Sequence, residues 1–448
     1  MENKMGKERI LQLLIRMSIP TIFSMFVISL YNIVDSYFIS KISEKAFRAI
    51  SLVFPIQTII IAISVGTGVG ANALIARYLG MDENKKANIV ANNSMSISLI
   101  LGLIIAIFGV VFSKTYFQIY TDDFEVIRYG VDYMQIITLL SVFLVIQIIV
   151  EKLIQATGEM IYPMLSQFMG AFINILLDPL LIFGYGPFPE MGIRGAAYAT
   201  IVSQILGALF CFVYLLKKDN PIHMNVKAMA LHKETIHEIY RIGGPSIVVQ
   251  AIPAVLIFGL NKILAEITEL AVSVLGIYFR LQSFVYMPVF GVTQATMPII
   301  AYNYGAKSKE RINDCLKYSI IISASIMALG TFIFLLFPRQ LISIFNPTKE
   351  IMDMAIIALR IFATIFIPSS ISIVLSTYYQ GLGNGIYNLI ISFLRQLVII
   401  LPLAKIFSSI DVNYTWYAWP IAEVFALLIS IYFAKRIYRD KVQVLSED

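Results

Sequence analysis

The chain has 448 residues, of which 58% are hydrophobic and only 14% are charged, and its mean hydropathy is +0.79. A soluble globular protein has about 45–50% apolar and about 25% charged residues, so the composition excludes that class and indicates an integral membrane protein. The formal net charge of +6 does not indicate nucleic-acid binding, because the basic residues are scattered through short polar segments and form no stripe.

Twelve apolar runs are long enough to cross a bilayer, for which a helix needs about 20 residues. In chain order they are residues 16–39, 50–75, 90–112, 131–154, 160–184, 193–216, 240–264, 276–301, 318–337, 352–378, 386–407 and 415–438. The strands of a membrane β-barrel are alternating segments of about 10 residues, which these runs do not resemble. The first run follows a basic segment but is too long for a signal peptide, so we expect it to be retained. The sequence therefore predicts an all-α integral membrane protein with twelve transmembrane helices.

The distribution of Lys and Arg predicts the orientation. If the N-terminus lies inside, the inner polar segments hold 20 of these residues and the outer segments hold 10. The positive-inside rule then places both termini in the cytoplasm. We expect a multi-pass protein of a prokaryotic plasma membrane.

An internal repeat appears when the second half is shifted along the first until Pro245 coincides with Pro20. Other landmarks that are rare in apolar helices coincide at this same repeat offset: Gly66 with Gly291, Gln155 with Gln380 and Gly158 with Gly383. Such repeats are common in transporters. The predicted organisation is an N-terminal six-helix lobe over residues 1–216, a cytoplasmic connector over 217–240, and a C-terminal six-helix lobe over 241–448, related as parallel repeats.

Polar residues inside the spans break this symmetry. Asp35, Asn174 and Asp178 are opposed by the aliphatic Leu260, Ile399 and Leu403 of the second half. An ionisable residue inside a span costs about 2.5–3.5 kcal/mol and usually marks a pathway or ion site. Asn174 and Asp178 are one helical turn apart, and Thr200 is expected at a similar depth.

Asp35, Asn174, Asp178 and Thr200 are therefore our candidate cation-coupling residues, with Asp35, Asn174 and Asp178 as metal ligands if the cation is Na⁺. Oxygen atoms suit a hard cation, whereas two neighbouring carboxyl groups also suit a proton. A purely structural role, with each Asp bonded to a polar neighbour or Thr200 serving only helix packing, stays open. Pro179 would free the carbonyl group of Ile175 as a further ligand.

Other motifs do not indicate catalysis. The Gly66–Gly70 segment has no preceding strand and no following Gly-Lys-Ser/Thr, so we interpret it as a helix-packing motif rather than a phosphate loop. His232 and His237 lie in the polar connector without partners at metal-binding spacing. Glu151 and Lys152 are expected to neutralise each other or to extend towards the interface. We expect no catalytic residue, no enzymatic activity and no cofactor other than the coupling ion, Na⁺ or H⁺.

The second half carries Arg280, Arg395 and Glu423 inside its spans, which either pair structurally or contact substrate. Aromatic and methionine side chains near Met287 offer an adaptable apolar wall, although core packing would explain most of them equally well. Our candidate substrate-cavity residues are Asn32, Gln57, Tyr278, Arg280, Gln282 and Met287.

At this point the chain resembles a known family, the multidrug and toxin extrusion (MATE) transporters of the MOP flippase superfamily, and is more similar to the DinF- and MepA-type branch than to the NorM-type branch. The resemblance covers essentially the whole chain. The segments that carry it are Pro20 with Tyr31-Asn32-Ile33-Val34-Asp35, Gly66–Gly70 running into Arg77-Tyr78-Leu79-Gly80, Gln155-Ala156-Thr157-Gly158, Asn174–Pro179, Gly195–Thr200, Gly305-Ala306-Lys307 and Gln380–Gly383.

The resemblance implies export of amphipathic, mostly cationic drugs in exchange for Na⁺ or H⁺, with a first-lobe cation site at the positions of Asp35, Asn174, Asp178 and Thr200. NorM-type members also carry acidic residues in the seventh and tenth spans. Here Leu260 and Asn261 occupy the seventh span with Glu266 at its outer end, and the 352–378 run has an acidic residue, Asp353, only at its start, so we do not expect a second-lobe cation site.

The leading hypothesis is a secondary antiporter that exports drugs by alternating access of two lobes, acting as a monomer in the lipid bilayer on small organic cations. A flippase for lipid-linked oligosaccharides of similar fold is the alternative, although only Arg280 and Arg395 are candidates to hold its phosphate groups. A membrane-embedded enzyme would need a catalytic set of residues that the sequence does not offer.

Overall fold

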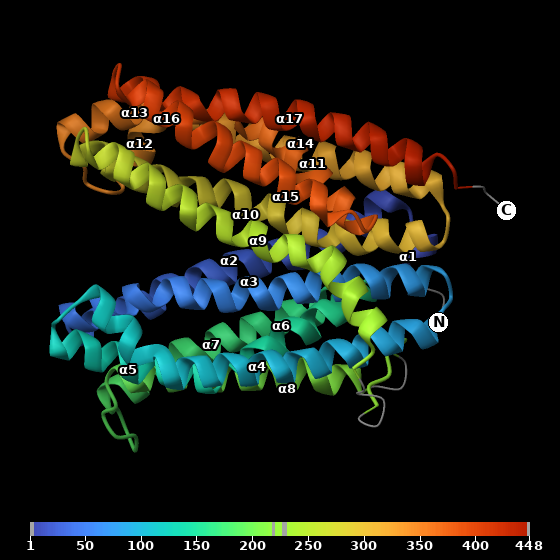
Figure 1. The fold of residues 1–448 in the computed structure, drawn as a ribbon, viewed down its shortest axis with the longest axis horizontal. Coiled ribbons are helices and arrows are strands. Elements are labelled where there is room, and N and C mark those ends of the chain that lie inside the picture. Colours follow the sequence, from blue (N-terminus) through green and yellow to red (C-terminus); the bar gives the residue numbers. More distant parts are fainter. Residues whose placement is uncertain (1–3, 217–219, 226–230, 446–448) are drawn as a thin grey trace. The chain divides into compact units, whose positions relative to one another are not determined.

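Every regular element in the part of the chain that the computed structural model describes, residues 4–216, 220–225 and 231–445, is a helix (Figure 1). Ten helices are long and apolar enough to cross a membrane, and the number rises to twelve if each of two bent helix pairs is one span. The bent pairs coincide with the predicted spans 131–154 and 352–378. The expectation of an all-α, multi-pass membrane protein is confirmed, with two of its spans broken.

The first half of the chain contains α1 (Lys4–Lys7), α2 (Ile10–Ile42), α3 (Glu44–Gly80), α4 (Asn84–Tyr120), α5 (Phe124–Leu139), α6 (Ser141–Ala156), α7 (Ile161–Phe183) and α8 (Ile193–Leu215). α5 and α6 meet at a bend of 48°. α7 ends at Gly184, whose φ of +72° is the left-handed conformation with which many helices stop.

The second half contains α9 (Lys233–Ala265), α10 (Glu269–Gly305), α11 (Lys309–Leu336), α12 (Pro338–Ser343), α13 (Lys349–Ala363), α14 (Phe366–Gly381), α15 (Gly385–Phe393), the π-helical turn η2 (Leu394–Ile400), α16 (Leu401–Ser408), the 3₁₀ turn η3 (Val412–Tyr417), α17 (Ala418–Ile437) and the π-helical turn η4 (Tyr438–Val442). α13 and α14 meet at a bend of 49°. α15, η2 and α16 run on as one span.

The helix boundaries repeat at the offset that pairs Pro20 with Pro245 in the sequence. Both ends of α10 coincide with the ends of α3 at this offset, and the start of α17 coincides with the start of α8. The bend between α13 and α14 falls at the place that corresponds to the bend between α5 and α6. The predicted internal repeat is therefore present in the fold as well as in the sequence.

Unusual backbone conformations repeat in the same way. Asp82 and Lys307, which correspond at the repeat offset, both have positive φ angles, of 58° and 56°. Gly158 and Gly383, which also correspond, have φ angles of 88° and 78°. Positive φ is uncommon for a residue other than glycine. Its recurrence at equivalent turns supports the conclusion that the two halves are structural repeats.

Two compact units make up the chain, and their limits lie inside helices. Unit 1 spans Phe23–Ile247, and unit 2 contains the chain up to Ile22 together with the chain from Val248 onwards. The first part of α2 thus belongs to unit 2, and the first part of α9 belongs to unit 1. These limits differ from the predicted boundaries at 216 and 241. Of the predicted connector, residues 217–219 and 226–230 lie outside the described residues.

Glycines explain why the first part of α9 belongs to unit 1. A Cβ atom on Gly243 of α9 would lie only 2.1 Å from the carbonyl oxygen of Gly66 on α3, and one on Gly70 would lie 2.1 Å from the carbonyl oxygen of Ile239. The two backbones therefore touch with no room for a side chain, which is the use of small residues typical of membrane helices. The interpretation of Gly66–Gly70 as a packing motif agrees with this geometry.

The equivalent contact in unit 2 joins α10 to the first part of α2. A Cβ atom on Gly291 would lie 2.7 Å from the backbone nitrogen of Ile22, and the Thr21 hydroxyl donates to the Gly291 carbonyl at 2.7 Å. Ile22 and Gly291 are the repeat counterparts of Ile247 and Gly66. Each unit is thus completed by the first part of a helix whose remainder belongs to the other unit.

Three asparagines of α4 hold the described part of the connector. The side-chain oxygens of Asn88, Asn92 and Asn93 accept hydrogen bonds from the backbone N–H groups of His223, Asn225 and His232 at 2.7, 2.9 and 2.7 Å. The connector has no regular secondary structure to satisfy these backbone N–H groups, so the asparagine side chains supply the acceptors that they need.

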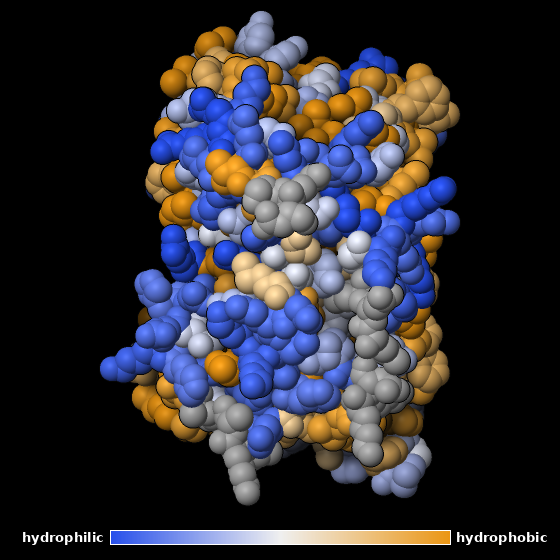
Figure 2. Space-filling model, turned by 90° about the vertical axis from the view of Figure 1, so that its right-hand side faces the viewer, coloured by the Kyte–Doolittle hydropathy of each residue, from blue (hydrophilic) through white to orange (hydrophobic). Residues whose placement is uncertain are grey.

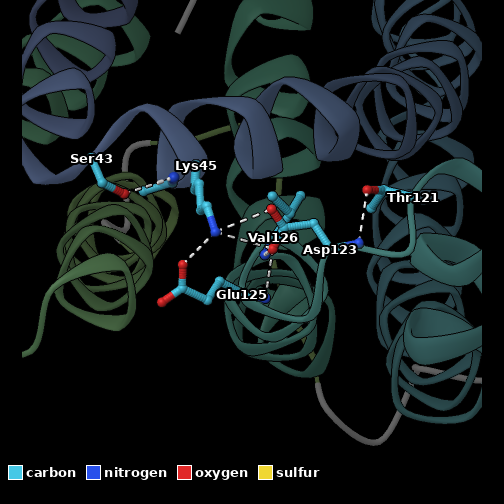
Figure 3. Close-up of polar contacts among 7 residues, drawn as sticks. Ser43, Lys45, Thr121, Asp123, Glu125 and Val126 are labelled. Carbon is cyan, nitrogen blue, oxygen red and sulfur yellow. Dashed lines mark hydrogen bonds and ion pairs between the residues drawn. The ribbon is translucent and has the colours of Figure 1, made fainter.

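Charged side chains link α3 to α5 at one end of unit 1 (Figure 3). Ser43 caps α3 by accepting from the Ala46 N–H, and Asp123 caps α5 by accepting from the Glu125 N–H. Lys45 bridges the two helix starts, with Nζ 2.6 Å from Glu125 and 3.1 Å from Asp123.

Hydrophilic residues gather on the face at which α1 and the end of α17 lie, with hydrophobic residues towards its margins (Figure 2).

Candidate functional site

The four predicted coupling residues all lie in unit 1 and come together there. Asp35 is on α2, Asn174 and Asp178 are on α7, and Thr200 is on α8. Asn174, Asp178 and Thr200 are buried, with exposed fractions of 1%, 0% and 6%, and Asp35 is half-buried. The carboxyl groups of Asp35 and Asp178 lie within hydrogen-bonding reach of each other.

Local sequence explains how α7 and α8 bring their polar groups together. Asn174 and Asp178 are one turn apart and so share a face of α7. Gly195 permits the close approach of α8, because a Cβ atom there would lie 2.4 Å from the Leu181 carbonyl oxygen. Pro179 lies inside α7 and has no N–H group to offer the carbonyl of Ile175.

The amide of Asn174 connects the two helices. One amide atom lies 3.0 Å from Asp178 Oδ2, and the other lies 3.2 Å from the backbone nitrogen of Thr200. A backbone nitrogen only donates and a carboxylate oxygen accepts, so the amide nitrogen faces Asp178 and the amide oxygen faces Thr200. The Thr200 hydroxyl is 3.4 Å from the amide oxygen of Asn174. Asn174 thereby holds the orientation of the Asp178 carboxylate.

Asp35 and Asp178 form an unusual pair. One oxygen of each, Oδ1, is buried and has no hydrogen-bond partner among the described residues. Two carboxylates in hydrogen-bonding reach repel each other unless a proton or a cation lies between them. The pair with its unpartnered oxygens therefore suits a single positive charge, whether a proton or a hard cation that prefers oxygen ligands.

Two tyrosines complete the site, and neither was among the candidates from the sequence. Tyr31 lies one turn before Asp35 on α2, close to the side chain of Thr200 and within electrostatic range of Asp35 and Asp178. Tyr133 on α5 lies within electrostatic range of Asp35 and Asp178. The four-residue spacing of Tyr31 and Asp35 was a signal that could have identified Tyr31. Nothing in the sequence pattern distinguished Tyr133.

The candidate substrate residues are divided between the units. In unit 1, Asn32 is exposed on α2, and Gln57 on α3 has its side-chain nitrogen 3.5 Å from the Tyr133 hydroxyl, which places it beside the candidate cation-coupling residues. Both remain candidates for contact with a substrate.

The unit 2 candidates lie along α10. Tyr278 is fully buried in the core, where its ring stacks on Phe362 with centroids 3.7 Å apart. This agrees with the alternative interpretation of Tyr278 as a core-packing residue. Arg280 is exposed, and its guanidinium lies 6.0 Å from the ring of Phe345. Gln282 and Met287 are half-buried.

The chain is similar to known proteins at the level of a family model, of individual relatives and of solved structures. The family model MatE matches the chain twice, over residues 20–180 and 245–406. The chain is 29% identical to "Multidrug export protein MepA" of Staphylococcus haemolyticus strain JCSC1435, over 90% of this chain and 88% of that protein.

Solved structures share the fold. One described as the "outward-facing conformation of a multidrug resistance MATE family transporter of the MOP superfamily" superposes with a TM-score of 0.91 at 25% identity, covering 100% of this chain and 99% of that one. A MOP superfamily transporter of Pyrococcus furiosus Vc1 (DSM3638), described as having a binding pocket of reverse polarity that suggests a different function, gives a TM-score of 0.90 at 25% identity, covering 100% and 99%. The two matches to the family model begin at Pro20 and Pro245, the residue pair that defines the repeat offset.

Proposed function

We propose that this chain, which belongs to the MatE family and to its MepA-like branch, is a multidrug efflux transporter that works as a secondary antiporter. It would export amphipathic, mostly cationic compounds in exchange for Na⁺ or H⁺. The observation that carries the proposal is the pair of Asp35 and Asp178, in hydrogen-bonding reach of each other inside unit 1, with one buried unpartnered oxygen on each.

The chemistry of the pair supports an exchange. Without a cation the two carboxylates carry like charges that disfavour each other, so the site has a strong preference for one proton or one Na⁺. Asp178 is held by Asn174, whereas Asp35 comes from α2 and is half-buried. Binding of the cation would draw Asp35 towards Asp178 and so act on α2.

The course of α2 supports a conformational response. The helix carries Asp35 in unit 1, while its first part, up to Ile22, belongs to unit 2, and Pro20 lies just before that limit. Proline removes one helical hydrogen bond and is a common cause of helix bending. Exchange requires only that the cation and the drug prefer different arrangements of the chain.

The flippase alternative loses one of its two candidate phosphate ligands. Arg395 forms an ion pair with the buried Glu423 and so carries little free positive charge for a phosphate group. We further propose that the protein acts as a monomer in a prokaryotic plasma membrane with both termini cytoplasmic, as the distribution of Lys and Arg indicates.

The test is efflux of a fluorescent organic cation from proteoliposomes under a Na⁺ gradient and, separately, under a pH gradient. Asp35→Asn and Asp178→Asn are compared with Asp132→Asn, a control in unit 1 whose carboxylate pairs with Arg194 at 2.9 Å. We expect one gradient to drive efflux by the wild type and the control, and neither gradient to drive efflux by the two site variants. Gradient-driven efflux by both site variants at the wild-type rate would refute the proposal.

A further inference from the structure

Unit 2 contains a buried ion pair on the elements that correspond to the cation site of unit 1. Arg395 Nη1 lies 3.2 Å from Glu423 Oε2, and the two side chains are 24% and 5% exposed. Arg395 is on η2 and Glu423 is on α17. By the repeat these elements correspond to α7 and α8, which carry Asn174, Asp178 and Thr200. α7 and α8 thus carry one acid, Asp178, whose partner Asp35 comes from α2, whereas η2 and α17 carry one acid and one base. At the repeat offset Arg395 and Glu423 coincide with Gly170 and Tyr198, so the pair shares the elements of the unit 1 site and not its sequence positions.

The backbone around Arg395 differs from that of its counterpart. α7 is α-helical from Ile161 to Phe183, whereas the corresponding stretch of unit 2 changes into a π-helical turn over Leu394–Ile400. π-turns are rare and occur frequently at functional sites. Arg395 is the second residue of this π-turn, so the irregular backbone of unit 2 begins at the residue that forms the ion pair.

The surroundings of Glu423 leave part of its carboxylate unused. Its second oxygen, Oε1, is buried without a hydrogen-bond partner among the described residues, as is the hydroxyl of Tyr278. Tyr278 and Tyr286 of α10 lie within electrostatic range of both Glu423 and Arg395. One carboxylate oxygen of Glu423 thus pairs with Arg395, and the other is available to bind a ligand.

The other elements packed against α17 bring no second positive charge next to Glu423 in the part of the chain that is described. α14 contacts α17 through the Tyr379 hydroxyl, which donates to the Ser430 carbonyl two turns away. Lys405 of α16 pairs with Glu266. α13 and η3 contribute the rings of Phe362 and Trp416. Arg395 is therefore the group that compensates the carboxylate.

We propose that Arg395 is a tethered counter-ion that supplies, on the unit 2 elements corresponding to α7 and α8, the positive charge that an exchangeable cation supplies in unit 1, and that it thereby restricts cation coupling to one unit. The inference rests on the proposed function, because it supposes that Asp35 and Asp178 bind the coupling cation. A buried carboxylate is costly unless it is paired, so the charge at this place must be supplied either by the chain or by an ion. Here the chain supplies it.

The proposal predicts a gain of binding when Arg395 is neutralised. Glu423 would then be an uncompensated buried carboxylate, and it would take up a monovalent cation, with Oε1 and the Tyr278 hydroxyl as available oxygen ligands. The variant would bind two cations where the wild type binds one. The second cation is either H⁺ or Na⁺, and the two are distinguished by measuring each alone.

The experiment counts cations bound to purified protein in lipid nanodiscs, with ²²Na⁺ in one arm and proton uptake at constant Na⁺ in the other. The variants are Arg395→Met, the doubly neutral Arg395→Met/Glu423→Gln, and Arg395→Lys, which keeps the charge. We expect one added cation in Arg395→Met, and none in the double variant or in Arg395→Lys. Equal cation numbers in wild type, Arg395→Met and the double variant would overturn the proposal and leave the pair as structural.

A second variant covers the case in which Arg395→Met does not fold, since breaking a buried pair costs about 3–5 kcal/mol. Arg395→Gln keeps an N–H donor for Glu423 and is expected to gain thermal stability as Na⁺ or proton concentration rises, relative to Arg395→Gln/Glu423→Gln. Equal responses of these two variants would also overturn the proposal. Failure of the proposed function is seen separately, as unchanged cation binding when Asp35→Asn and Asp178→Asn are introduced into the wild type.

Discussion

The contact between α3 and the first part of α9 offers a sharp test of how unit 1 is held together. Gly243 and Gly244 are neighbours on α9, yet their surroundings are opposite. A Cβ atom on Gly243 would lie 2.1 Å from the Gly66 carbonyl oxygen, whereas a Cβ atom on Gly244 would have nothing within 4 Å. Gly243→Ala and Gly244→Ala therefore make the same chemical change in the same helix, with and without a steric clash.

The magnitude follows from the geometry. A close carbon–oxygen contact needs about 3.3 Å, so the Gly243→Ala methyl group forces the two backbones apart by roughly 1.2 Å. Overpacking of this kind costs about 1–3 kcal/mol. Replacing glycine by alanine in a helix also gains roughly 0.5–1 kcal/mol, but this gain is common to both variants. The difference between them thus isolates the packing cost, which corresponds to a factor of about 5–150 in population.

The assay is thermal unfolding of the two variants in nanodiscs, together with efflux of a fluorescent organic cation from proteoliposomes. We expect Gly244→Ala to equal or slightly exceed the wild type in stability, and Gly243→Ala to melt below both and to transport more slowly. If Gly243→Ala is as stable as Gly244→Ala, the backbone contact between α3 and α9 does not hold unit 1 together.

Two further predictions concern polar contacts at the ends of unit 1. In the connector, Asn93→Ala should accelerate amide hydrogen exchange at His232 by about tenfold, because the lost hydrogen bond contributes about 0.5–1.5 kcal/mol. The amide of His223, which bonds to Asn88, should exchange at its wild-type rate. Equal acceleration at both amides would contradict the pairing of Asn93 with His232. At the start of α3, Lys45 lowers the pKa of Asp123, so the stabilisation from this carboxylate is present above the unfolded-state pKa and is lost as the pH falls through the lower folded-state pKa. Lys45→Met should therefore flatten the acid side of the stability–pH curve, whereas the control Lys41→Met, at a lysine that lies over the Tyr37 ring, should keep the wild-type slope; identical curves for the two variants would refute the link.

The spans and the repeat could be predicted from sequence because each has a simple physical cause. A membrane helix needs about 20 apolar residues, and that requirement is visible in any window of the chain. The break after Leu139 was not predictable, because neither α5 nor α6 contains a proline and an apolar run specifies the length of a helix but not its direction. The break after Ala363 had a signal that the apolar pattern did not use: Pro368 lies in the first turn of α14 and has no N–H to offer the carbonyl of Thr364.

The site was predictable where it broke the pattern and hidden where it followed it. Asp35, Asn174 and Asp178 stood out against aliphatic counterparts. Tyr133 did not, since tyrosine is ordinary in an apolar helix and its role depends on how α5 packs. Glu151 shows the same limit. The sequence suggested that Glu151 and Lys152 neutralise each other or extend towards the interface, but the Glu151 carboxylate accepts hydrogen bonds from Gln147, Ser166 and Gln167. Which neighbours satisfy a buried charge is decided by packing between helices.

The two units share one backbone plan and differ in how buried charge is compensated, and this difference bears directly on mechanism. If both units bound an exchangeable cation, each transport step would have to await two binding events. If Asp35 and Asp178 bind the coupling cation, the fixed Arg395 beside Glu423 would keep unit 2 compensated throughout, so that only the Asp35 and Asp178 pair would change charge. Because α2 carries Asp35 in unit 1 and belongs to unit 2 in its first part, a charge change in one unit acts on a helix that both units share. On the proposed function, a repeated scaffold with one exchangeable and one tethered charge would therefore be sufficient to couple a single cation to a conformational change.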